Sequence, residues 1–573
     1  MTIKTTYDTK IKYVIILTIF TGITVAIQGY NLGSIYYFGF VLLIPLLVSY
    51  YILKNKIKRY MITAEWGKHP NKKQYYDSLD IFYRYVHPDP SDDIIDDTTW
   101  SDLNMDKIYA EIDRTYTAQG EYALYDILKS PLTDASLLNE RLRKIKYFEN
   151  NQKHRETILF ELLKLKNKDI YNSAEILWGE LPKKVKSRYF FDIMYLLAVC
   201  SLLSIFLFGK AALLAVIAVF LINSYIYYHL KSTYSNIVPA VKYLSKIIKT
   251  ADRIRKKSPK NFEYRDKLAK LIKTTKPLYK KIRFLKPPLF FETAESFFEL
   301  VNMYFLRELR GFYNASEKIN KSRESLKELY CTIGEIDAMI SIGSFKAGCV
   351  NYCRAEFIDS PDPDYYIKAV DAYHPLLEKP VSNSFIFTKT GIIITGSNMA
   401  GKSTFLRTVG INVLLAQTLG ICFAKQFELP FMKIITSINK SDDLTGGKSF
   451  YFNESDRLLK IINTAGGQGL CLCIIDELLA GTNSFERLKA SEAILRYLTK
   501  KNTITLAATH DITLATDMEE MYECYHFIDT VDDSGMNFDY KMKHGISITT
   551  NAIRMLDYMG YPKEIINEAL KDR

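Results

Sequence analysis

The chain has 573 residues, of which 48% are hydrophobic and 24% are charged, and its formal net charge is +12 at pH 7. This length argues against a single domain, and the hydrophobic fraction lies in the globular range, so large cores can form. The positive charge is local, because residues 242–286 hold 17 Lys and Arg against 3 Asp and Glu. That run carries +14 and leaves about −2 for the rest of the chain, which excludes a uniformly basic surface.

The first long feature is an apolar stretch near the start of the chain. No charged residue occurs between Lys12 and Lys54, and the stretch is interrupted only near residues 28–31. Two spans of about 17–20 residues fit, and each is long enough to cross a hydrocarbon core at ~1.5 Å per residue. A cleavable signal peptide would have a shorter apolar region and no second span directly after it. We therefore expect residues 1–60 to form an N-terminal transmembrane hairpin.

Residues 190–230 form a second apolar pair, with a short break at Gly209-Lys210. A buried helical hairpin in a soluble domain is the alternative interpretation. Lys and Arg gather on the outer flanks of both pairs, whereas the connecting tips carry only Lys210. Positive charge stays in the cytoplasm. The pattern predicts a multi-pass protein of the cell membrane, with its polar segments in the cytoplasm and two external tips, near Asn31 and Lys210.

The polar segments differ in their periodicity. Residues 61–189 and 231–370 carry apolar residues at three- and four-residue spacing, which predicts mainly helical structure. From Phe385 onwards, short β-branched runs alternate with helical stretches. That alternation is typical of an α/β layer with a largely parallel sheet. We expect residues 371–573 to form an α/β domain with a C-terminal helical tail.

The eight cysteines form no Cys-x-x-Cys pair. Cys349 and Cys353 are four residues apart on a predicted helix, but no His or second Cys pair lies nearby to complete a zinc site. We expect no zinc and no structural disulfide, as in a reducing compartment.

A glycine-rich loop stands between a predicted strand at 392–395 and a predicted helix at 404–415. It matches the pattern GxxxxGK[ST], in which loop N–H groups and the helix N-terminus bind phosphate oxygens. Lys402 would place a positive charge on the β- and γ-phosphates, and Ser403 would offer a hydroxyl to Mg²⁺. A chance glycine loop is the alternative, and the strand–loop–helix context argues against it. The predicted nucleotide-binding residues are Gly396, Ser397, Asn398, Met399, Ala400, Gly401, Lys402, Ser403 and Thr404.

Two further predicted strands end in polar residues. The strand at 470–475 runs into Asp476 and Glu477. We expect Asp476 to hold Mg²⁺ and Glu477 to deprotonate the attacking water, although a simple helix cap is the alternative. The strand at 505–508 leads to His510, which would face the ligand crevice of an open α/β sheet unless it is structural.

Together these motifs resemble the MutS mismatch-repair ATPase family. The matching stretches are TGSNMAGKST (395–404), SDDLTGGKSFYFNE (441–454), IIDELLAGTN (474–483) and AATH (507–510). Residues 112–131, 329–357 and the tail 540–570 resemble the family's lever domain, its connecting helix and its post-ATPase segment. The resemblance implies a P-loop (ABC-like) ATPase domain behind a helical lever domain, with ATP and Mg²⁺ as cofactors. It also implies a dimer in which Ser449 caps the ATP of the partner subunit.

The sequence departs from the family in several places. The family usually has Pro where Ser397 stands, and no Phe-x-Glu mismatch-reading module can be placed. The hairpin at 190–230 interrupts the lever region, and Val381 stands where the family has an adenine-stacking aromatic residue. These departures affect base selectivity and mismatch recognition rather than ATP hydrolysis.

The basic run at 242–286 leaves two functions open, with a solvated helix face as the plain alternative. One is a homodimeric, membrane-anchored ATPase that contacts the phosphate backbone of duplex or branched DNA without sequence specificity. The other is a membrane-anchored mechanoenzyme or scaffold without DNA binding, in which the run lies on anionic membrane lipid. We favour DNA binding.

Overall fold

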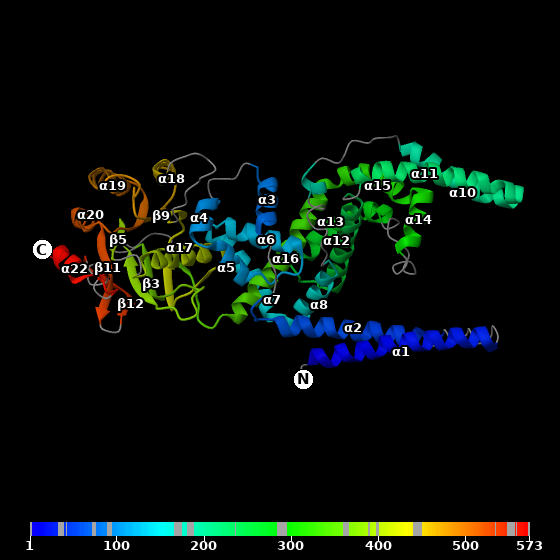
Figure 1. Ribbon diagram of the computed structural model, residues 1–573, viewed down its shortest axis with the longest axis horizontal. Coiled ribbons are helices and arrows are strands. Elements are labelled where there is room, and N and C mark those ends of the chain that lie inside the picture. Colours follow the sequence, from blue (N-terminus) through cyan, green and yellow to red (C-terminus); the bar gives the residue numbers. More distant parts are fainter. Residues whose placement is uncertain are drawn as a thin grey trace.

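The computed structural model describes residues 3–32, 39, 41, 43–70, 76–88, 94–165, 175–179, 188–234, 237–282, 295–358, 366–387, 390–396, 400–438, 450–532, 535–546, 556 and 559–570. The part before residue 349 is helical, and the part after it contains all the described strands, as the sequence predicted (Figure 1).

The helical part is built around α16 (Arg323–Gly348), whose middle is buried on all sides. Asp337 of α16 accepts hydrogen bonds from Thr117 N at 2.8 Å and Tyr116 N at 3.0 Å, and so caps the start of α6. The other helices of this part are α3 (Tyr76–Val86), α4 (Asp97–Asp102), α5 (Met105–Ile112), α6 (Ala118–Lys129), α7 (Ala135–Asn150), α8 (Gln152–Leu162), the short 3-10 helix η2 (Leu163–Leu165), α12 (Ile237–Lys257), α13 (Tyr264–Ile282), α14 (Glu295–Phe305) and α15 (Arg307–Lys321).

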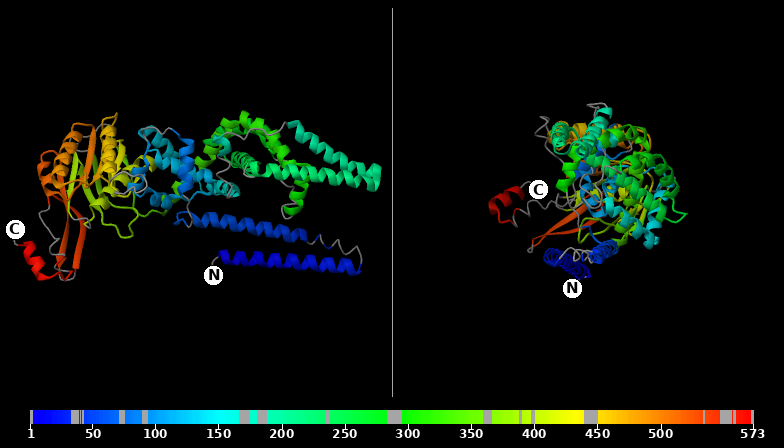
Figure 2. Two further views of the ribbon diagram at one scale, coloured as in Figure 1. Left: turned by 45° about the horizontal axis from the view of Figure 1, so that its top comes forward. Right: turned by 90° about the vertical axis from the view of Figure 1, so that its right-hand side faces the viewer.

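Two helical hairpins project from this part. The first consists of α1 (Ile3–Leu32) and α2 (Leu43–Glu65), and the second of α10 (Arg188–Phe208) and α11 (Ala212–Tyr234), joined by the 3-10 turn η3 (Gly209–Ala211). Both hairpins point the same way, away from the strands (Figures 1 and 2). Large apolar side chains are exposed along both of them.

The break predicted near residues 28–31 was placed too early, because α1 continues without interruption to Leu32 and α2 begins at Leu43. A single glycine in a helix costs only about 1 kcal/mol, so Gly29 does not end it. The break at Gly209-Lys210 is confirmed. Among the described residues, Ile11–Gln28 and Tyr189–Leu230 are long and apolar enough to cross a membrane by length and composition.

The α/β part contains a six-stranded sheet in the order β12-β11-β5-β10-β9-β8, in which only β12 is antiparallel to its neighbour. Its strands are β5 (Gly391–Thr395), β8 (Lys433–Ser437), β9 (Cys471–Asp476), β10 (Thr503–Ala508), β11 (Glu523–Asp532) and β12 (Gly535–His544). The helices of this part are α17 (Lys402–Leu419), α18 (Phe450–Ala465), α19 (Ser484–Leu498), α20 (Ile512–Asp517) and α22 (Lys563–Leu570). Strands β5 and β10 are buried at every position, so they form the centre of the core.

A second, four-stranded sheet has the order β2-β7-β3-β4, and β1 pairs with β6. These strands are β1 (Cys353–Arg354), β2 (Glu356–Phe357), β3 (Ile367–Ala372), β4 (Asn383–Phe387), β6 (Ile421–Cys422) and β7 (Gln426–Leu429). The expectation that Cys349 and Cys353 share a helix is wrong. Helix α16 ends at Gly348, and Cys353 lies on β1 opposite Cys422, because the chain becomes extended to pair with β6.

Candidate functional site

The predicted site residues follow three neighbouring parallel strands. Ala508 of β10 is in register with Ile394 of β5 on one side and with Asp476 of β9 on the other. The carboxyl ends of the three strands therefore meet at one edge of the sheet, where open α/β sheets bind their ligands. The residues directly after each strand are brought together there.

Lys402 is the first residue of α17 and is only 1% exposed. Its Nζ donates to the carbonyl oxygen of Gly396 at 2.5 Å and lies 3.4 Å from Nδ1 of His510. The flanking glycines Gly396 and Gly401 have φ of +132° and +106°, in the left-handed region that favours glycine. A Cβ on Gly396 would lie 2.8 Å from the carbonyl oxygen of Phe527. The described residues on either side of positions 397–399 thus flank a buried ammonium group at a helix start, and helix starts favour the binding of phosphate groups.

Ser403 and Asp476 form a pair of oxygen ligands. The hydroxyl of Ser403 donates to Oδ2 of Asp476, which ends β9. A hydroxyl and a carboxylate side by side, next to the predicted phosphate-binding loop, suit Mg²⁺, which prefers oxygen ligands and is usually held by one or two carboxylates plus phosphate oxygens.

Glu477 and His510 face one another. Oε1 of Glu477 lies 2.5 Å from Nε2 of His510. A neutral imidazole with its proton on Nε2 satisfies both neighbours, since Nε2 donates to Glu477 and Nδ1 accepts from Lys402. Glu477 has φ of +57°, which is unusual for a residue with a side chain, and its N–H donates to the carbonyl oxygen of Ala508 at 2.9 Å. Such strained backbone is often found at functional sites.

Some predicted site residues are not brought into this cluster. Ala400 is fully buried, and Thr404 lies at an exposed position on the first turn of α17. Ser397, Asn398, Met399 and Ser449 lie outside the described residues, so their predicted roles stay predictions.

Sequence reasoning missed the role of α18. Glu454 accepts hydrogen bonds from the N–H groups of Ala480 at 3.1 Å and Gly481 at 3.3 Å, in the loop that follows Glu477. A signal was present, because Glu454 ends the family-like stretch 441–454 and lies on the first turns of a helix that starts near Phe450.

The next turns of α18 reach the helical part. Arg457 forms an ion pair with Asp96 at 2.5 Å, and Lys460 contacts the same carboxylate at 2.7 Å. Burial alone would raise the pKa of Asp96, but the hydrogen bonds and charges of Arg457 and Lys460 outweigh burial and hold this pKa well below its usual range. Asp96 also caps α4 by accepting from Thr99 N. Nothing in the local sequence pairs Asp96 with residues more than 350 positions away.

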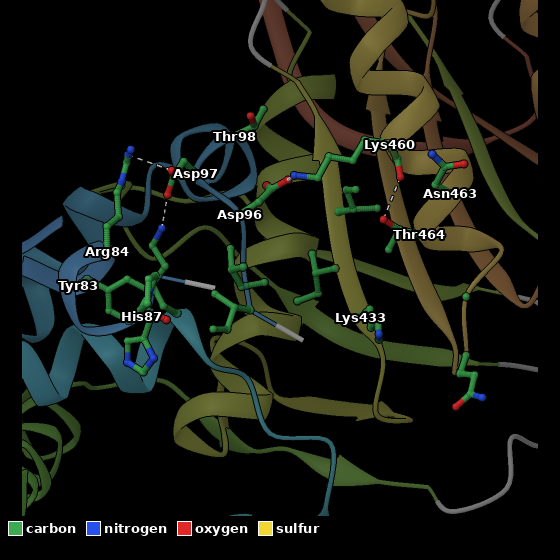
Figure 3. A pocket seen from close by; sticks show the side chains of 18 residues that line it. Tyr83, Arg84, His87, Asp96, Asp97, Thr98, Lys433, Lys460, Asn463 and Thr464 are labelled. Atoms are coloured by element: carbon green, nitrogen blue, oxygen red, sulfur yellow. Dashed lines mark hydrogen bonds and ion pairs between the residues drawn. The ribbon is translucent and has the colours of Figure 1, made fainter. Parts of the chain in front are cut away.

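A cavity of about 1000 Å³ lies along this seam between the two parts. Figure 3 shows Lys460 of α18 reaching Asp96, and Arg84 of α3 reaching Asp97. Lys129 also pairs with Asp97, at 2.5 Å. Ion pairs at this cavity thus join α3 and α6 to the first residue of α4, and the N-cap residue of α4 to α18. The cavity does not include the cluster around Lys402.

In the basic run 242–286 several charges form ion pairs, and a group of lysines lies on the exposed side of α13. On α12, Lys242 pairs with Glu308, Lys257 with Glu161, and Lys256 with Asp252. On the outer face of α13, the exposed basic residues are Lys267, Lys270, Lys273, Lys276 and Lys280. Lys267 lies 3.6 Å from Glu328. Within the described part of the chain, no cluster of three or more His, Cys, Asp or Glu could hold a metal ion.

The comparisons with known proteins concern the same half of the chain. Residues 392–572 match the family model of MutS domain V, so the α/β part is a domain of this class. The chain is 27% identical over 274 residues to the DNA mismatch repair protein MutS of Natronomonas pharaonis, an overlap of 46% of this chain and 31% of that protein. It is 30% identical to the protein of the same name from Thermus aquaticus, over 46% of this chain and 32% of that protein. It is also 30% identical to the one from Aquifex pyrophilus, over 46% of this chain and 31% of that protein.

The chain belongs to the MutS family. It spans about a third of the length of these curated relatives.

Proposed function

We propose that the protein is a membrane-anchored ATPase of the MutS family, which binds and hydrolyses ATP with Mg²⁺ and couples hydrolysis to non-specific DNA binding. The observation that carries this proposal is the convergence of Lys402, Ser403, Asp476, Glu477 and His510 at one edge of a parallel sheet. Glycine loop, buried lysine, hydroxyl, paired carboxylates and histidine are the parts that phosphoryl transfer to water requires.

In this mechanism each side chain has one task. Lys402 and the N–H groups at the start of α17 bind and orient the phosphates. Ser403 and Asp476 would hold Mg²⁺, which when bound neutralises charge on the phosphate oxygens. Glu477 accepts the proton of the attacking water. His510 fixes the position of the Glu477 carboxylate through its Nε2 proton, and its Nδ1 accepts from Lys402.

The family also implies that the site is completed in a homodimer. Ser449 would reach the ATP of the partner subunit, so two nucleotides would lie at the interface. Ser449 directly precedes α18 in the sequence. Closure of the dimer would therefore move the start of that helix.

Helix α18 is suited to carry the state of the site to the helical part. Glu454 holds the loop after Glu477, and one to two turns later Arg457 and Lys460 hold Asp96. A shift of α18 would therefore move both ends together, since each end is joined by hydrogen bonds to charged groups, which are stronger than neutral ones. Asp96 would then transmit the movement to α4.

Membrane anchoring is supported by the shared direction of the two hairpins and by their exposed apolar side chains (Figures 1 and 2). In water such surfaces would be costly, at about 25 cal/mol per Å² of exposed apolar area. Placed in one bilayer, both hairpins would put the strands and the helical part on the same, cytoplasmic side.

The outer face of α13 supports nucleic-acid binding over lipid binding. Helix α13 has 19 residues and is therefore about 28 Å long. Helix α13 packs along α12, which follows the second hairpin in the chain. Its exposed lysines, from Lys267 to Lys280, are spread over about 20 Å of the helix. A face that is basic along its whole length fits a phosphate backbone better than a membrane surface.

A membrane scaffold without DNA binding is the second candidate. It is favoured by the position of the basic run directly after α11. In that case exposed lysines of α13 would contact anionic lipid, where each Lys or Arg contributes about 1 kcal/mol.

The nucleotide site is tested by Lys402→Ala in the full chain, purified in detergent. We expect this variant to lose ATP binding, measured with a fluorescent ATP analogue, because the loop loses the ammonium at its centre. The matched control is Lys489→Ala on α19, whose side chain is 60% exposed and should not affect binding. Undiminished binding by Lys402→Ala would contradict the proposed site.

A further inference from the structure

Helix α14 is the short helix beside the second hairpin, and its sequence, ESFFELVNMYF, is rich in large apolar residues. Its 11 residues span about 16 Å, which is too short to cross a hydrocarbon core of about 30 Å. A short apolar helix of this kind is either a core helix or one that lies at a membrane interface. In Figure 1, α14 runs across the direction of α10 and α11 rather than along it.

The C-terminal end of α14 is fixed between the two helices of the hairpin. The hydroxyl of Tyr304 lies 2.7 Å from Oγ of Ser201 on α10. Nδ2 of Asn223 on α11 donates to the carbonyl oxygen of Tyr304 at 2.6 Å. The ring of Phe305 packs against Tyr195 with centroids 5.7 Å apart. These contacts set the depth of α14 along the hairpin.

That depth can be measured from the charged residues at the hairpin base. Asp192 of α10 pairs with Arg310 of α15 at 2.6 Å, which marks a polar layer. Ser201 lies nine residues farther along α10, or about 13 Å toward the tip. Tyr304 points its hydroxyl toward Ser201, so the axis of α14 lies between the polar layer and that depth. Interfacial helices lie about 5–10 Å into the boundary between headgroups and acyl chains.

The two faces of α14 differ in polarity, as a helix at a membrane interface requires. Oδ1 of Asn302 accepts from Glu308 N at 2.9 Å, so this face points back to α15 and the helical part. With 3.6 residues per turn, Tyr304 lies on nearly the opposite face, and Leu300 lies one turn before it on the same face. Leu300 is 48% exposed. The apolar side of α14 thus faces the tip of the hairpin and has an exposed leucine there.

We propose that α14 is a third membrane-contacting element, lying in the plane of the bilayer with the Leu300 face against lipid acyl chains. The occupant of this face is lipid, because the face continues the exposed apolar surface of α10 and α11 at the same depth. The inference rests on the proposed membrane anchoring. It also implies that the lipid contact is apolar rather than electrostatic, since the charged residues of the sequence of α14 are both glutamates.

The test is quenching of tryptophan fluorescence by brominated acyl chains, in the full chain reconstituted into phosphatidylcholine vesicles. Three single variants are compared with the parent, whose three tryptophans give the background. Leu300→Trp reports on α14. Leu221→Trp reports on α11, where Leu221 is 62% exposed, and Lys321→Trp reports on the far end of α15, where the lysine side chain is 73% exposed.

We expect brominated lipid to quench the added fluorescence of Leu300→Trp to an extent comparable with that of Leu221→Trp, and to leave that of Lys321→Trp unchanged. Quenching of Leu221→Trp without quenching of Leu300→Trp would overturn the location of α14 and leave the membrane anchoring standing. Absence of quenching at both positions would overturn the anchoring itself, and the location of α14 with it.

Discussion

The strand ends of the α/β part and the basic helices α12 and α13 use charge in opposite ways. At the strand ends a few charged side chains converge, and each contacts another residue of the proposed site, as Glu477 contacts His510. On α12 and α13 the charges are many, and packing alone decides which are structural and which face solvent. Lys242 pairs with Glu308 and is only 25% exposed, whereas Lys270 is exposed. A dense run of lysines therefore says less about function than a few polar residues after strands.

The largest expected effect concerns the exposed face of α13. Reversing the charge of Lys270, Lys273 and Lys280 to Glu should reduce the salt dependence of DNA binding, because each phosphate contact releases counterions. The slope of log K against log salt should fall by up to about three units, at about 0.9 per phosphate. The measurement is binding of the full chain in detergent to duplex and branched DNA over a salt series.

The control for α13 is Lys489→Glu on α19, a single exposed lysine outside the run, which should leave the slope unchanged. We also expect less than tenfold preference for mismatched over matched duplex, because no mismatch-reading module can be placed in the sequence. A complete lack of DNA binding at low salt would contradict the DNA proposal and favour the scaffold alternative.

The same contrast shows what sequence could and could not predict. Residues at strand ends can be predicted because the register of a parallel sheet puts the residues after neighbouring strands side by side. Asp476 and His510 could therefore be placed from the sequence. The pairing of Asp96 with Arg457 could not, since it depends on how two parts of the chain pack. For the same reason the sequence did not separate Lys242, which is paired with Glu308 and only 25% exposed, from the exposed lysines of α13. Helix α14 was assigned only to a helical segment, because 11 residues are too few to signal a membrane element.

The seam between the two parts gives the second prediction. Asp96→Asn keeps a residue that can cap α4 but removes the charge that Arg457 and Lys460 share. Hydrogen bonds to charged groups contribute about 1.5–3 kcal/mol each, so we expect a loss of about 2–3 kcal/mol in the free energy of unfolding. We also expect DNA to stimulate ATP hydrolysis less, because α18 loses its hold on α4. Thermal unfolding and ATP turnover with and without DNA measure the two effects.

The comparison variant for Asp96 is Glu317→Gln, which removes an exposed ion pair with Lys321 and should change stability by no more than about 1 kcal/mol. If Asp96→Asn proved as stable as this control and kept full stimulation by DNA, the seam would not couple the two parts.

The effect that we expect to be smallest near neutral pH, and to grow only on acidification, is a pH dependence of stability in both parts. Burial lowers the pKa of His374 in the α/β part to about 4, helped by the charge of Arg407, and burial lowers the pKa of His154 in the helical part to about 4. Between pH 6.5 and 4 the unfolded chain binds a proton at each position and the folded chain does not, so stability is full above pH 6.5 and falls toward pH 4. The loss is on the order of 1 kcal/mol per pH unit and histidine.

Melting temperatures of the parent, His374→Gln and His154→Gln between pH 4 and 7 measure this effect, and each variant should show a flatter dependence than the parent. His69→Gln is the opposite control. The hydrogen bond to Glu111 raises the pKa of His69, so its contribution is present below pH 6.5 and is lost as the pH rises. Equal slopes in the parent and in both buried-histidine variants would contradict the buried neutral state of these rings.

The central claim is that the cluster at the strand ends hydrolyses ATP with Glu477 as the base. The most direct measurement is ATP turnover by the full-length Glu477→Gln variant, together with its ATP affinity and with Glu519→Gln, an exposed position, as control. Because an amide cannot accept the proton of water, the account predicts unchanged ATP binding and a rate about 10²–10⁴-fold lower than that of the parent. Hydrolysis by Glu477→Gln at the parent rate would contradict it.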